Sequence, residues 1–229
     1  MNTKHKKPTL TKKQRHKLRV QQVRRQKIFL TCLFLLIVGC ILLRFSKFSG
    51  RQKETHQINA ACEAYLDEVS SEAAQYDMSD YVDLILAVMM QESSGQGTDP
   101  MQSSEGAYNT RYPQQPNGIT DPSYSISCGI QELKYALDKA GCTGPTDLSK
   151  IRLALQAYNF GADSYFAYLE ENGQTVWTAQ SAQAFAQMAS SNTQRDEDDP
   201  LHDPAGPWDY GDQYYPDHVL RYYHLDNNS

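Results

Sequence analysis

A hydrophobic segment of the sequence ends in a carboxylate. Residues 81–94, YVDLILAVMMQESS, are mostly apolar until Glu92 and are followed by Gly95. On a helical period of 3.6 residues, Ile85 and Val88 share a face with Glu92. Apolar surroundings and the negative end of the helix dipole both disfavour the charged form of a carboxyl group. Glu92 is therefore a candidate general acid, which must hold its proton near neutral pH. A partly exposed glutamate at a fraying helix end would have the same spacing and no catalytic role.

The elements that must position Glu92 are predicted to be helices. Their expected bounds are 60–75, 79–93, 123–140, 147–160, 163–171, 178–190 and 216–223. The candidate caps are Ser79 or Asp80, Ser123 or Ser125, and Asp147 or Ser149, with Gly141 ending the third helix. Residues 95–122 predict a long loop rich in Gly, Pro, Ser, Asn and Gln, and residues 195–213 an acidic loop. Because β-alternation is nearly absent, the fold class is predicted to be all-α.

Charge is divided unevenly along the chain. Residues 1–27 contain 11 Lys and Arg and no acid, whereas the part from Glu54 onward contains 7 Lys and Arg and all 27 acidic residues. A nucleic-acid-binding domain carries the opposite charge, so no nucleic acid is expected as a partner of this acidic part. The basic arm precedes an uncharged 16-residue run, residues 28–43, IFLTCLFLLIVGCILL.

The uncharged run predicts a single transmembrane helix behind which the acidic domain lies. As a helix it would be about 24 Å long, slightly short for a hydrocarbon core of about 30 Å. No small-residue cleavage site follows, which favours an uncleaved signal anchor over a cleaved signal peptide. The expected organisation is a basic cytoplasmic arm (1–27), a signal anchor (28–44), a stalk (45–58) and an extracytoplasmic domain (59–229). The positive-inside rule places the N-terminus in the cytoplasm.

Five cysteines leave the redox state open. Cys32 and Cys40 lie in the apolar run, and Cys62, Cys128 and Cys142 lie in the acidic part. Cys128 and Cys142 could form a disulfide, which would leave an odd thiol. Because no Cys and His residues cluster at metal-ligand spacing, neither a metal nor another cofactor is expected.

Three segments carry a resemblance to a known family. They are residues 89–109, MMQESSGQGTDPMQSSEGAYN, residues 127–131, SCGIQ, and residues 157–161, AYNFG. Together they resemble the goose-type lysozyme and lytic transglycosylase superfamily. The narrower resemblance is to the lysozyme-like domain of wall hydrolases from Gram-positive conjugative elements, which residues 210–223, YGDQYYPDHVLRYY, also fit. The resemblance covers about residues 60–224 and implies a lysozyme-like helical fold.

The resemblance also implies roles for individual residues. Glu92 would be the catalytic acid and Asp99 a second acid of the site. The substrate-binding residues would be Ser93, Gln131, Tyr158 and Asn159. Each of these four also has a purely structural interpretation, as a helix cap, a bridge between helices, a core residue or a helix terminator.

The implied substrate is the glycan strand of peptidoglycan, cut at the β-1,4 bond between N-acetylmuramic acid (MurNAc) and N-acetylglucosamine (GlcNAc). If Asp99 activates water, the enzyme is a muramidase; if the sugar's own 6-hydroxyl attacks, it is a lytic transglycosylase that forms 1,6-anhydro-MurNAc. The acid at Asp99 favours the muramidase. A non-catalytic wall-binding scaffold is a third option, which the intact Glu92 disfavours. By analogy, the activity would open the wall for a conjugation machine, whose subunits are possible partners.

The resemblance also has departures. The bifunctional members carry a second, cysteine-peptidase domain, for which these 229 residues offer no candidate. The acidic insertion at residues 195–209 has no assigned role.

Overall fold

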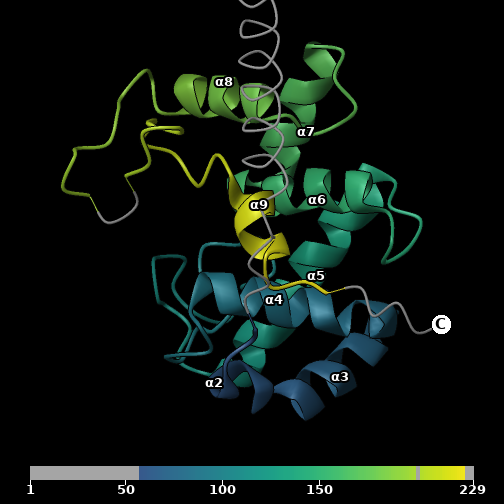
Figure 1. Cartoon of the computed structure of the whole chain (residues 1–229). Coiled ribbons are helices and arrows are strands. Elements are labelled where there is room, and N and C mark those ends of the chain that lie inside the picture. Colours follow the sequence, from purple (N-terminus) through teal and green to yellow (C-terminus); the bar gives the residue numbers. More distant parts are fainter. Residues whose placement is uncertain (1–56, 200–201, 225–229) are drawn as a thin grey trace, which may run out of the picture. The chain divides into compact units, whose positions relative to one another are not determined.

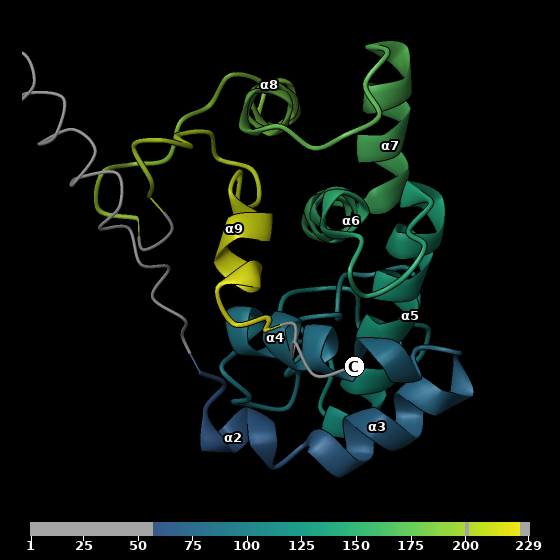
Figure 2. The same cartoon turned by 45° about the vertical axis from the view of Figure 1, so that its right-hand side comes forward.

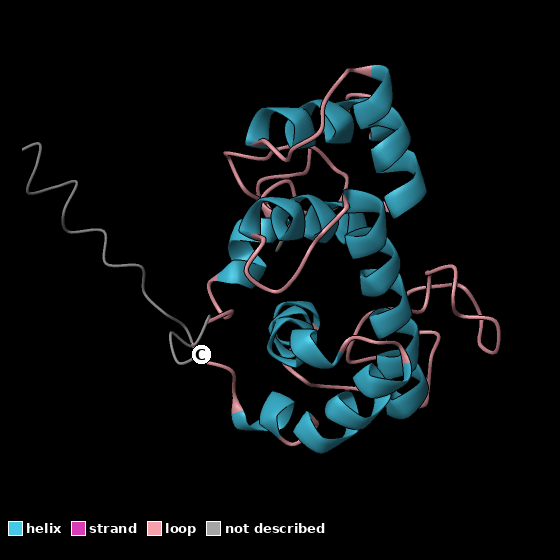
Figure 3. Cartoon of the chain, turned by 90° about the vertical axis from the view of Figure 1, so that its right-hand side faces the viewer, coloured by secondary structure: helices cyan, strands magenta, loops and turns pink. Residues whose placement is uncertain are grey.

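Helices surround the segment that ends in Glu92. The computed structural model describes residues 57–199 and 202–224, and within them no strand forms apart from an isolated bridge between Gln194 and Trp208. The helices are α2 (Ala60–Glu63), α3 (Leu66–Gln75), the 3₁₀ turn η1 (Ser79–Tyr81), α4 (Val82–Glu92), α5 (Pro122–Ala140), α6 (Leu148–Phe160), α7 (Ala162–Glu171), α8 (Ala179–Ala189) and α9 (Tyr215–Leu220) (Figure 1). Figure 3 shows that helices and loops make up this part of the chain, which confirms the all-α prediction for it.

Helix α4 is a core helix and not a surface one. Residues 84–89 are all buried, so the helix is apolar on every side. Helices α2 and α3 pack on one side of α4 and α9 packs on the other, as Figure 2 shows. Burial on all sides fixes the axis of α4 and thereby the place where its last residue, Glu92, leaves the core.

A second packing centre lies where α6, α7 and α8 meet. The rings of Phe160, Tyr165 and Phe185 lie with centroids 5.2–5.3 Å apart. Helix α6 packs on α5, α7 and α9, so it links this aromatic centre to α4 through α9. Tyr158 and Asn159 lie in the last turn of α6, next to Phe160 of this aromatic centre.

The first predicted helix is divided. Residues 60–75 form two helices, α2 and α3, separated by a turn at Ala64 and Tyr65. The Asn59 side chain caps α2 by accepting a hydrogen bond from the backbone N–H of Cys62. Asn59 also donates through Nδ2 to the carbonyl of Ser94 at 3.0 Å. This contact ties the start of the described region to the end of α4, which spacing within 60–75 alone does not predict.

The cap of α5 differs from both predicted residues. Asp121 caps the helix by accepting from the N–H of Ser123, and Pro122 occupies the first turn, where its missing N–H is harmless. Ser125 is instead fully buried and donates to Asp99 at 2.6 Å. The predicted end is confirmed, because Gly141 has φ of 69°, a left-handed conformation that favours glycine. Asp147 caps α6 as predicted.

The three cysteines of the described region are free thiols. Cys128 lies early in α5 and Cys142 lies two residues beyond its end. At about 1.5 Å per residue, the helix separates Cys128 from Ala140 by roughly 18 Å, and the two residues that follow are too short to return to the distance of about 7 Å that a disulfide requires between Cα atoms. The predicted helix therefore already excluded the suggested Cys128–Cys142 pair.

The predicted signal anchor at 28–44, the basic arm and nearly all of the stalk lie outside the described residues. Within residues 57–199 and 202–224, no helix has the length and apolar character needed to cross a bilayer.

Candidate active site

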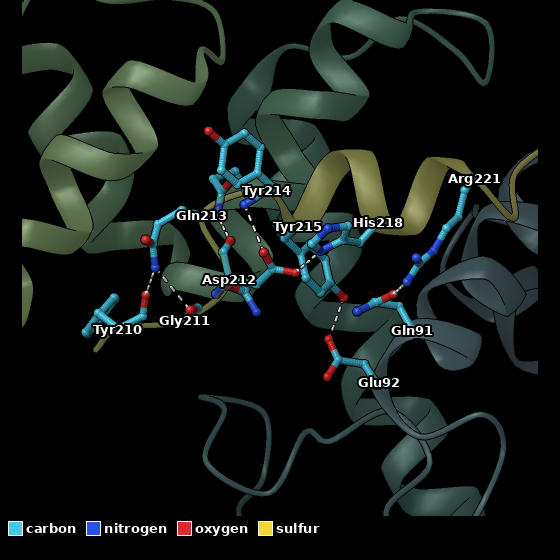
Figure 4. A network of polar contacts seen from close by, with 12 residues as sticks. Gln91, Glu92, Tyr210, Gly211, Asp212, Gln213, Tyr214, Tyr215, His218 and Arg221 are labelled. Carbon is cyan, nitrogen blue, oxygen red and sulfur yellow. Dashed lines mark hydrogen bonds and ion pairs between the residues drawn. The ribbon is translucent and has the colours of Figure 1, made fainter. Parts of the chain in front are cut away.

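Glu92 lies where α4 ends and a cleft begins. Two adjoining cavities of about 590 and 640 Å³ are both lined by Glu92, Gln102 and Asn159. The Glu92 side chain is half-buried and accepts a hydrogen bond through Oε1 from the hydroxyl of Tyr215 (Figure 4). A glutamate at the junction of two cavities can contact sugar units on both sides of a bond to be cut.

The surroundings of Glu92 hold a proton on it. The pKa of Glu92 is raised from 4.5 to about 7, chiefly by burial; the hydrogen bond from Tyr215 lowers it, and the carboxylates of Asp212 and Asp99 also raise it. A carboxyl group with a pKa raised in this way can hold a proton near neutral pH, as general acid catalysis requires. The fraying-end alternative does not apply, because Glu92 is held in the structure by a residue of another helix.

Two tyrosines support Glu92 from α6 and α9. The rings of Tyr158 and Tyr215 stack with centroids 6.2 Å apart. Tyr158 donates to the carbonyl of Met101 at 2.9 Å, which fixes its ring. Burial and the negative charge of Glu92 raise the pKa of Tyr215 well above its usual value, so its hydroxyl stays protonated and remains a donor. Tyr158 thus lines one cavity of the cleft, and a structural hydrogen bond to the loop holds it there.

The segment 210–223 builds the far wall of the cleft. His218 Nδ1 lies 2.5 Å from Asp212 Oδ2, and Asp212 Oδ1 accepts from the N–H of Tyr214 at 2.8 Å (Figure 4). The hydrogen bond to Asp212 raises the pKa of His218 while burial lowers it. Arg221 donates to Gln91 at 2.9 Å, next to Glu92 in sequence. Residues 210–223 thus supply Tyr215 to Glu92 and contact the end of α4 through Arg221. The sequence motif alone did not predict these two roles.

Asn159 joins this wall to α6. Its Oδ1 accepts from the N–H of Asp212 at 2.7 Å. A Cβ atom on Gly211 would lie 2.7 Å from the same oxygen, so glycine permits the close approach. The Asn159 side chain lines both cavities, and within the described residues its Nδ2 donates no hydrogen bond. This amide N–H₂ is therefore available to a ligand in the cleft.

Asp99 is a buried residue of the loop of residues 93–121. Its side chain is 1% exposed and lines neither cavity. Oδ1 accepts from Ser103 N at 3.0 Å and Ser125 Oγ at 2.6 Å, and Oδ2 accepts from the N–H and the hydroxyl of Ser104. Every contact of the Asp99 carboxylate therefore orders the loop and fastens it to α5.

Ser93 and Gln131 also make structural contacts. Ser93 Oγ donates to the carbonyl of Pro100 at 2.8 Å and accepts from Gly95 N at 3.1 Å. Gln131 Nε2 donates to the carbonyl of Ser127 at 3.1 Å and lines a separate hollow, not the cavities at Glu92. The structure therefore brings Glu92, Tyr158 and Asn159 together in one cleft and leaves Ser93 and Gln131 outside its lining.

Glu132 faces the cleft in place of its neighbour Gln131, and the sequence analysis missed it. It lines the same 590 Å³ cavity as Glu92, and burial raises its pKa from 4.5 to about 7. Ser125, Gly129 and Glu132 share one face of α5 at helical spacing. A Cβ atom on Gly129 would lie 2.6 Å from Met101 Cβ, so glycine lets the loop rest on this face. That spacing was the available indication of which residue of 127–132 faces the loop.

The comparisons with known proteins agree with this geometry. Residues 60–223 match the family described as Lysozyme-like. The chain belongs to the lysozyme-like family. This membership confirms the lysozyme-like resemblance seen in the motifs. Within the described residues, no group of three or more His, Cys, Asp and Glu side chains could hold a metal ion.

Three other proteins are similar to this chain over much of its length. The "Bifunctional muramidase/DL-endopeptidase CwlT" of Bacillus subtilis is 35% identical over 76% of this chain and 43% of its own length. The "Uncharacterized membrane protein YocA" of B. subtilis is 34% identical over 68% of this chain and 65% of its own length. A crystal structure of a protein from Staphylococcus aureus, described as similar to a lipoprotein of the NLP/P60 family, superposes with a TM-score of 0.61 at 26% identity, over 76% of this chain and 56% of that one. The chain thus spans less than two thirds of each of these relatives.

Proposed function

We propose that the lysozyme-like domain is a muramidase that cuts the MurNAc–GlcNAc β-1,4 bond of peptidoglycan with Glu92 as the general acid. The observation that carries the proposal is the protonated Glu92 at the junction of two cavities, with its pKa raised to about 7 by burial. The similarity to CwlT, which is described as a muramidase, supports the same reaction.

In this mechanism the glycan lies across Glu92 with one sugar in each cavity. Glu92 donates its proton to the bridging oxygen, and the C1–O bond breaks through a transition state with oxocarbenium character. The carboxylate that forms keeps the hydrogen bond from Tyr215, which stabilises it as its charge develops. Water then completes the hydrolysis at C1 of MurNAc.

A lytic transglycosylase is the second candidate, and the position of Asp99 favours it. The Asp99 carboxylate is buried and fully engaged by the loop, so it has no access to an attacking water. A cleft with Glu92 as its one functional carboxyl would rely on the 6-hydroxyl of MurNAc as nucleophile. The product would then carry a 1,6-anhydro ring.

Product analysis in heavy-oxygen water separates the two reactions. The full chain in detergent is incubated with purified peptidoglycan in H₂¹⁸O, and the released muropeptides are examined by mass spectrometry. A muramidase yields reducing-end MurNAc that carries one ¹⁸O atom. Anhydro-muramyl ends without the label would refute the muramidase and establish the transglycosylase. A chain without any glycan cleavage on several wall types would leave the wall-binding scaffold as the function.

We also propose that residues 28–44 anchor the enzyme in the cell membrane, with its domain facing the wall and its N-terminus in the cytoplasm. Support comes from the uncharged run at 28–43 and the basic arm before it. Recruitment of conjugation subunits by the arm or the anchor is a further part of the proposal. Protease added to cells without a wall should degrade the domain and leave an N-terminal fragment in the membrane fraction. Release of the intact domain into the medium would contradict the anchor.

A further inference from the structure

Hydrolysis needs a group that takes a proton from water, and three carboxylates in or beside the cleft are already engaged. Asp99 is buried and bound by the loop. Asp212 is bound to His218 and to the N–H of Tyr214. Asp163 is exposed and bound to Tyr135 and Lys139, each at 2.5 Å. These contacts leave each of the three without a free, desolvated oxygen near the bond to be cut.

Glu132 differs from these carboxylates. Its side chain is half-buried in the cavity that Glu92 lines, and its buried Oε1 has no hydrogen-bond partner. A Cβ atom on Gly106 would lie 1.4 Å from that oxygen, so the loop closes over the carboxyl where its side chain is absent. A carboxyl that is covered by backbone, lacks a cation and opens on the cleft is costly to stability. Backbone N–H groups of the loop, those of Tyr108 and Ala107, interact with this carboxyl, and among the described residues no side chain hydrogen-bonds to its Oε1.

The charges of Glu132 and Glu92 both influence the side chain of Tyr158. They come from different helices, α5 and α4, and the negative charges of both raise the pKa of the Tyr158 phenol. The two carboxyls therefore approach one cavity from separate elements. Such a pair can flank a sugar ring, with one carboxyl at the leaving oxygen and the other on the opposite face.

We propose that Glu132 is the catalytic base of the hydrolysis, a role that rests on the proposed muramidase function. Its carboxylate takes one proton from a water molecule while the water oxygen bonds to C1 of MurNAc. The C1–O bond breaks, its electron pair goes to the GlcNAc O4, and that oxygen takes the proton of Glu92. Glu132 then loses its proton to solvent and Glu92 regains one. Attack on the face opposite the leaving group inverts the anomeric centre.

The charges around Glu132 fit a base. The pKa of Glu132 is raised to about 7, chiefly by burial; the carboxylates of Asp99 and Glu92 also raise it, and the backbone N–H groups of Tyr108 and Ala107 lower it. A carboxylate with this pKa is a stronger base than an ordinary glutamate at neutral pH.

The test compares Glu132→Gln and Glu132→Ala with Asp138→Asn, all in the full chain in detergent. Asp138 is an exposed residue of the same helix, paired with Lys134, and it lines neither cavity. We expect Glu132→Gln to lower kcat by about 10²–10⁴-fold, the usual contribution of a general base. Asp138→Asn should retain native kcat. Sodium azide should restore glycan cleavage to Glu132→Ala and yield an α-glycosyl azide, because azide attacks without losing a proton. The native enzyme should release the α-anomer of MurNAc, observed by NMR before it equilibrates.

Three results would overturn the role of Glu132. They are native kcat in Glu132→Gln, release of the β-anomer by the native enzyme, and an inactive Glu132→Ala that azide does not restore. Azide cannot repair a folding defect, so its effect separates a base from a structural residue. Glu92→Gln in the same assays tests the muramidase itself: cleavage that depends on Glu92 but not on Glu132 sinks the base alone, whereas cleavage that is independent of Glu92 sinks the proposed function.

Discussion

At the scale of single residues, Glu92 is set between two opposing effects. Burial favours its protonated form, and the donor Tyr215 favours its carboxylate. The result, a pKa of about 7, suits a group that must give up a proton and take it back in each cycle. Tyr215 can keep this role because its own proton is held firmly by burial and by the adjacent Glu92 charge.

Removal of the Tyr215 hydroxyl tests this balance. Tyr215→Phe takes away the interaction that lowers the pKa of Glu92, so that pKa should rise. Activity requires protonated Glu92 and is lost as pH rises through its pKa, so the alkaline limb of kcat/KM should move to higher pH. The pH profile of peptidoglycan cleavage measures the shift. Tyr223→Phe is the matched control, because the Tyr223 hydroxyl donates at 2.8 Å to Pro145 and Tyr223 lines neither cavity. An unmoved limb, or one moved to lower pH, would contradict the assigned role of Tyr215.

Glu92 could be predicted from sequence and its partner could not. The apolar spacing of α4 is local information, and it indicated a carboxyl at the end of a core-facing helix. Tyr215 lies 123 residues further along the chain, so only the packing of α9 on α4 brings it to Glu92. Glu132 was missed for a related reason: the motif indicated the helix, but only the loop that rests on Gly129 defines which side of α5 faces the cleft.

At the scale of elements, the loop of residues 93–121 and helix α5 form one wall of the cleft. Asp99 joins them, since its oxygens accept from loop residues Ser103 and Ser104 and from Ser125 of α5. Long loops without helices or strands are usually functional, and here buried polar contacts give the loop a fixed shape. The loop was predicted from its composition. Asp99, whose carboxylate orders the loop, was predicted to be a catalytic acid.

Asp99→Asn distinguishes these two roles. If Asp99 orders the loop, an amide N–H₂ would face the N–H donors of Ser103 or Ser104, and the free energy of unfolding should fall by about 1–3 kcal/mol together with activity. If Asp99 instead acted on water as a catalytic acid, Asp99→Asn would lose activity and keep nearly native stability. Thermal unfolding followed by circular dichroism measures the difference, with Asp138→Asn as an exposed carboxyl control expected to change stability little. Native unfolding of Asp99→Asn would contradict the loop-ordering role.

Gly129→Ala tests the contact between the loop and α5. In most helices this change is stabilising by about 1 kcal/mol. Here the new Cβ would lie 2.6 Å from Met101 Cβ, so overpacking should reverse the sign and cost about 1–3 kcal/mol. Tyr158 should also be displaced, because its hydroxyl donates to the Met101 carbonyl. Urea unfolding of Gly129→Ala beside Gly144→Ala, whose Cβ would meet no atom within 4 Å, measures the effect. A more stable Gly129→Ala would show that the loop does not rest on α5 at this point.

At the scale of the whole molecule, the catalytic carboxyls reduce stability as the solution becomes alkaline. Folding raises the pKa of both Glu92 and Glu132 from 4.5 to about 7, so the folded state binds more protons than the unfolded one between these values. The stability that this proton binding provides is present at acidic pH and is lost as pH rises through about 7. Each shift is worth up to about 3 kcal/mol before solvent screening is allowed for. His218, with its raised pKa, adds a change of the same sign.

The native chain should therefore unfold at a lower temperature at pH 8 than at pH 5, and Glu92→Gln should lose less stability over that range. Thermal unfolding at the two pH values tests this difference between the chains. Equal losses in the native chain and the variant would contradict the buried, protonated state of Glu92. Repulsion within the acidic domain is common to both chains and cancels in the comparison.

At this scale, the helical fold class and the family were the properties that the sequence predicted best. The absence of β-alternation predicted the helical architecture, and the motifs gave the family before any packing was known. The anchor at 28–44 stays a prediction, which depends on hydropathy and charge alone.

The rate of glycan cleavage by Glu92→Gln decides whether Glu92 is the general acid. The variant keeps the size of the side chain and a hydrogen-bond acceptor for Tyr215, but it has no proton of suitable acidity to donate. With folding verified by circular dichroism, we expect release of muropeptides from purified peptidoglycan to fall by at least about 10²-fold, the contribution of a general acid. Cleavage by Glu92→Gln at the native rate would show that Glu92 is not the catalytic acid.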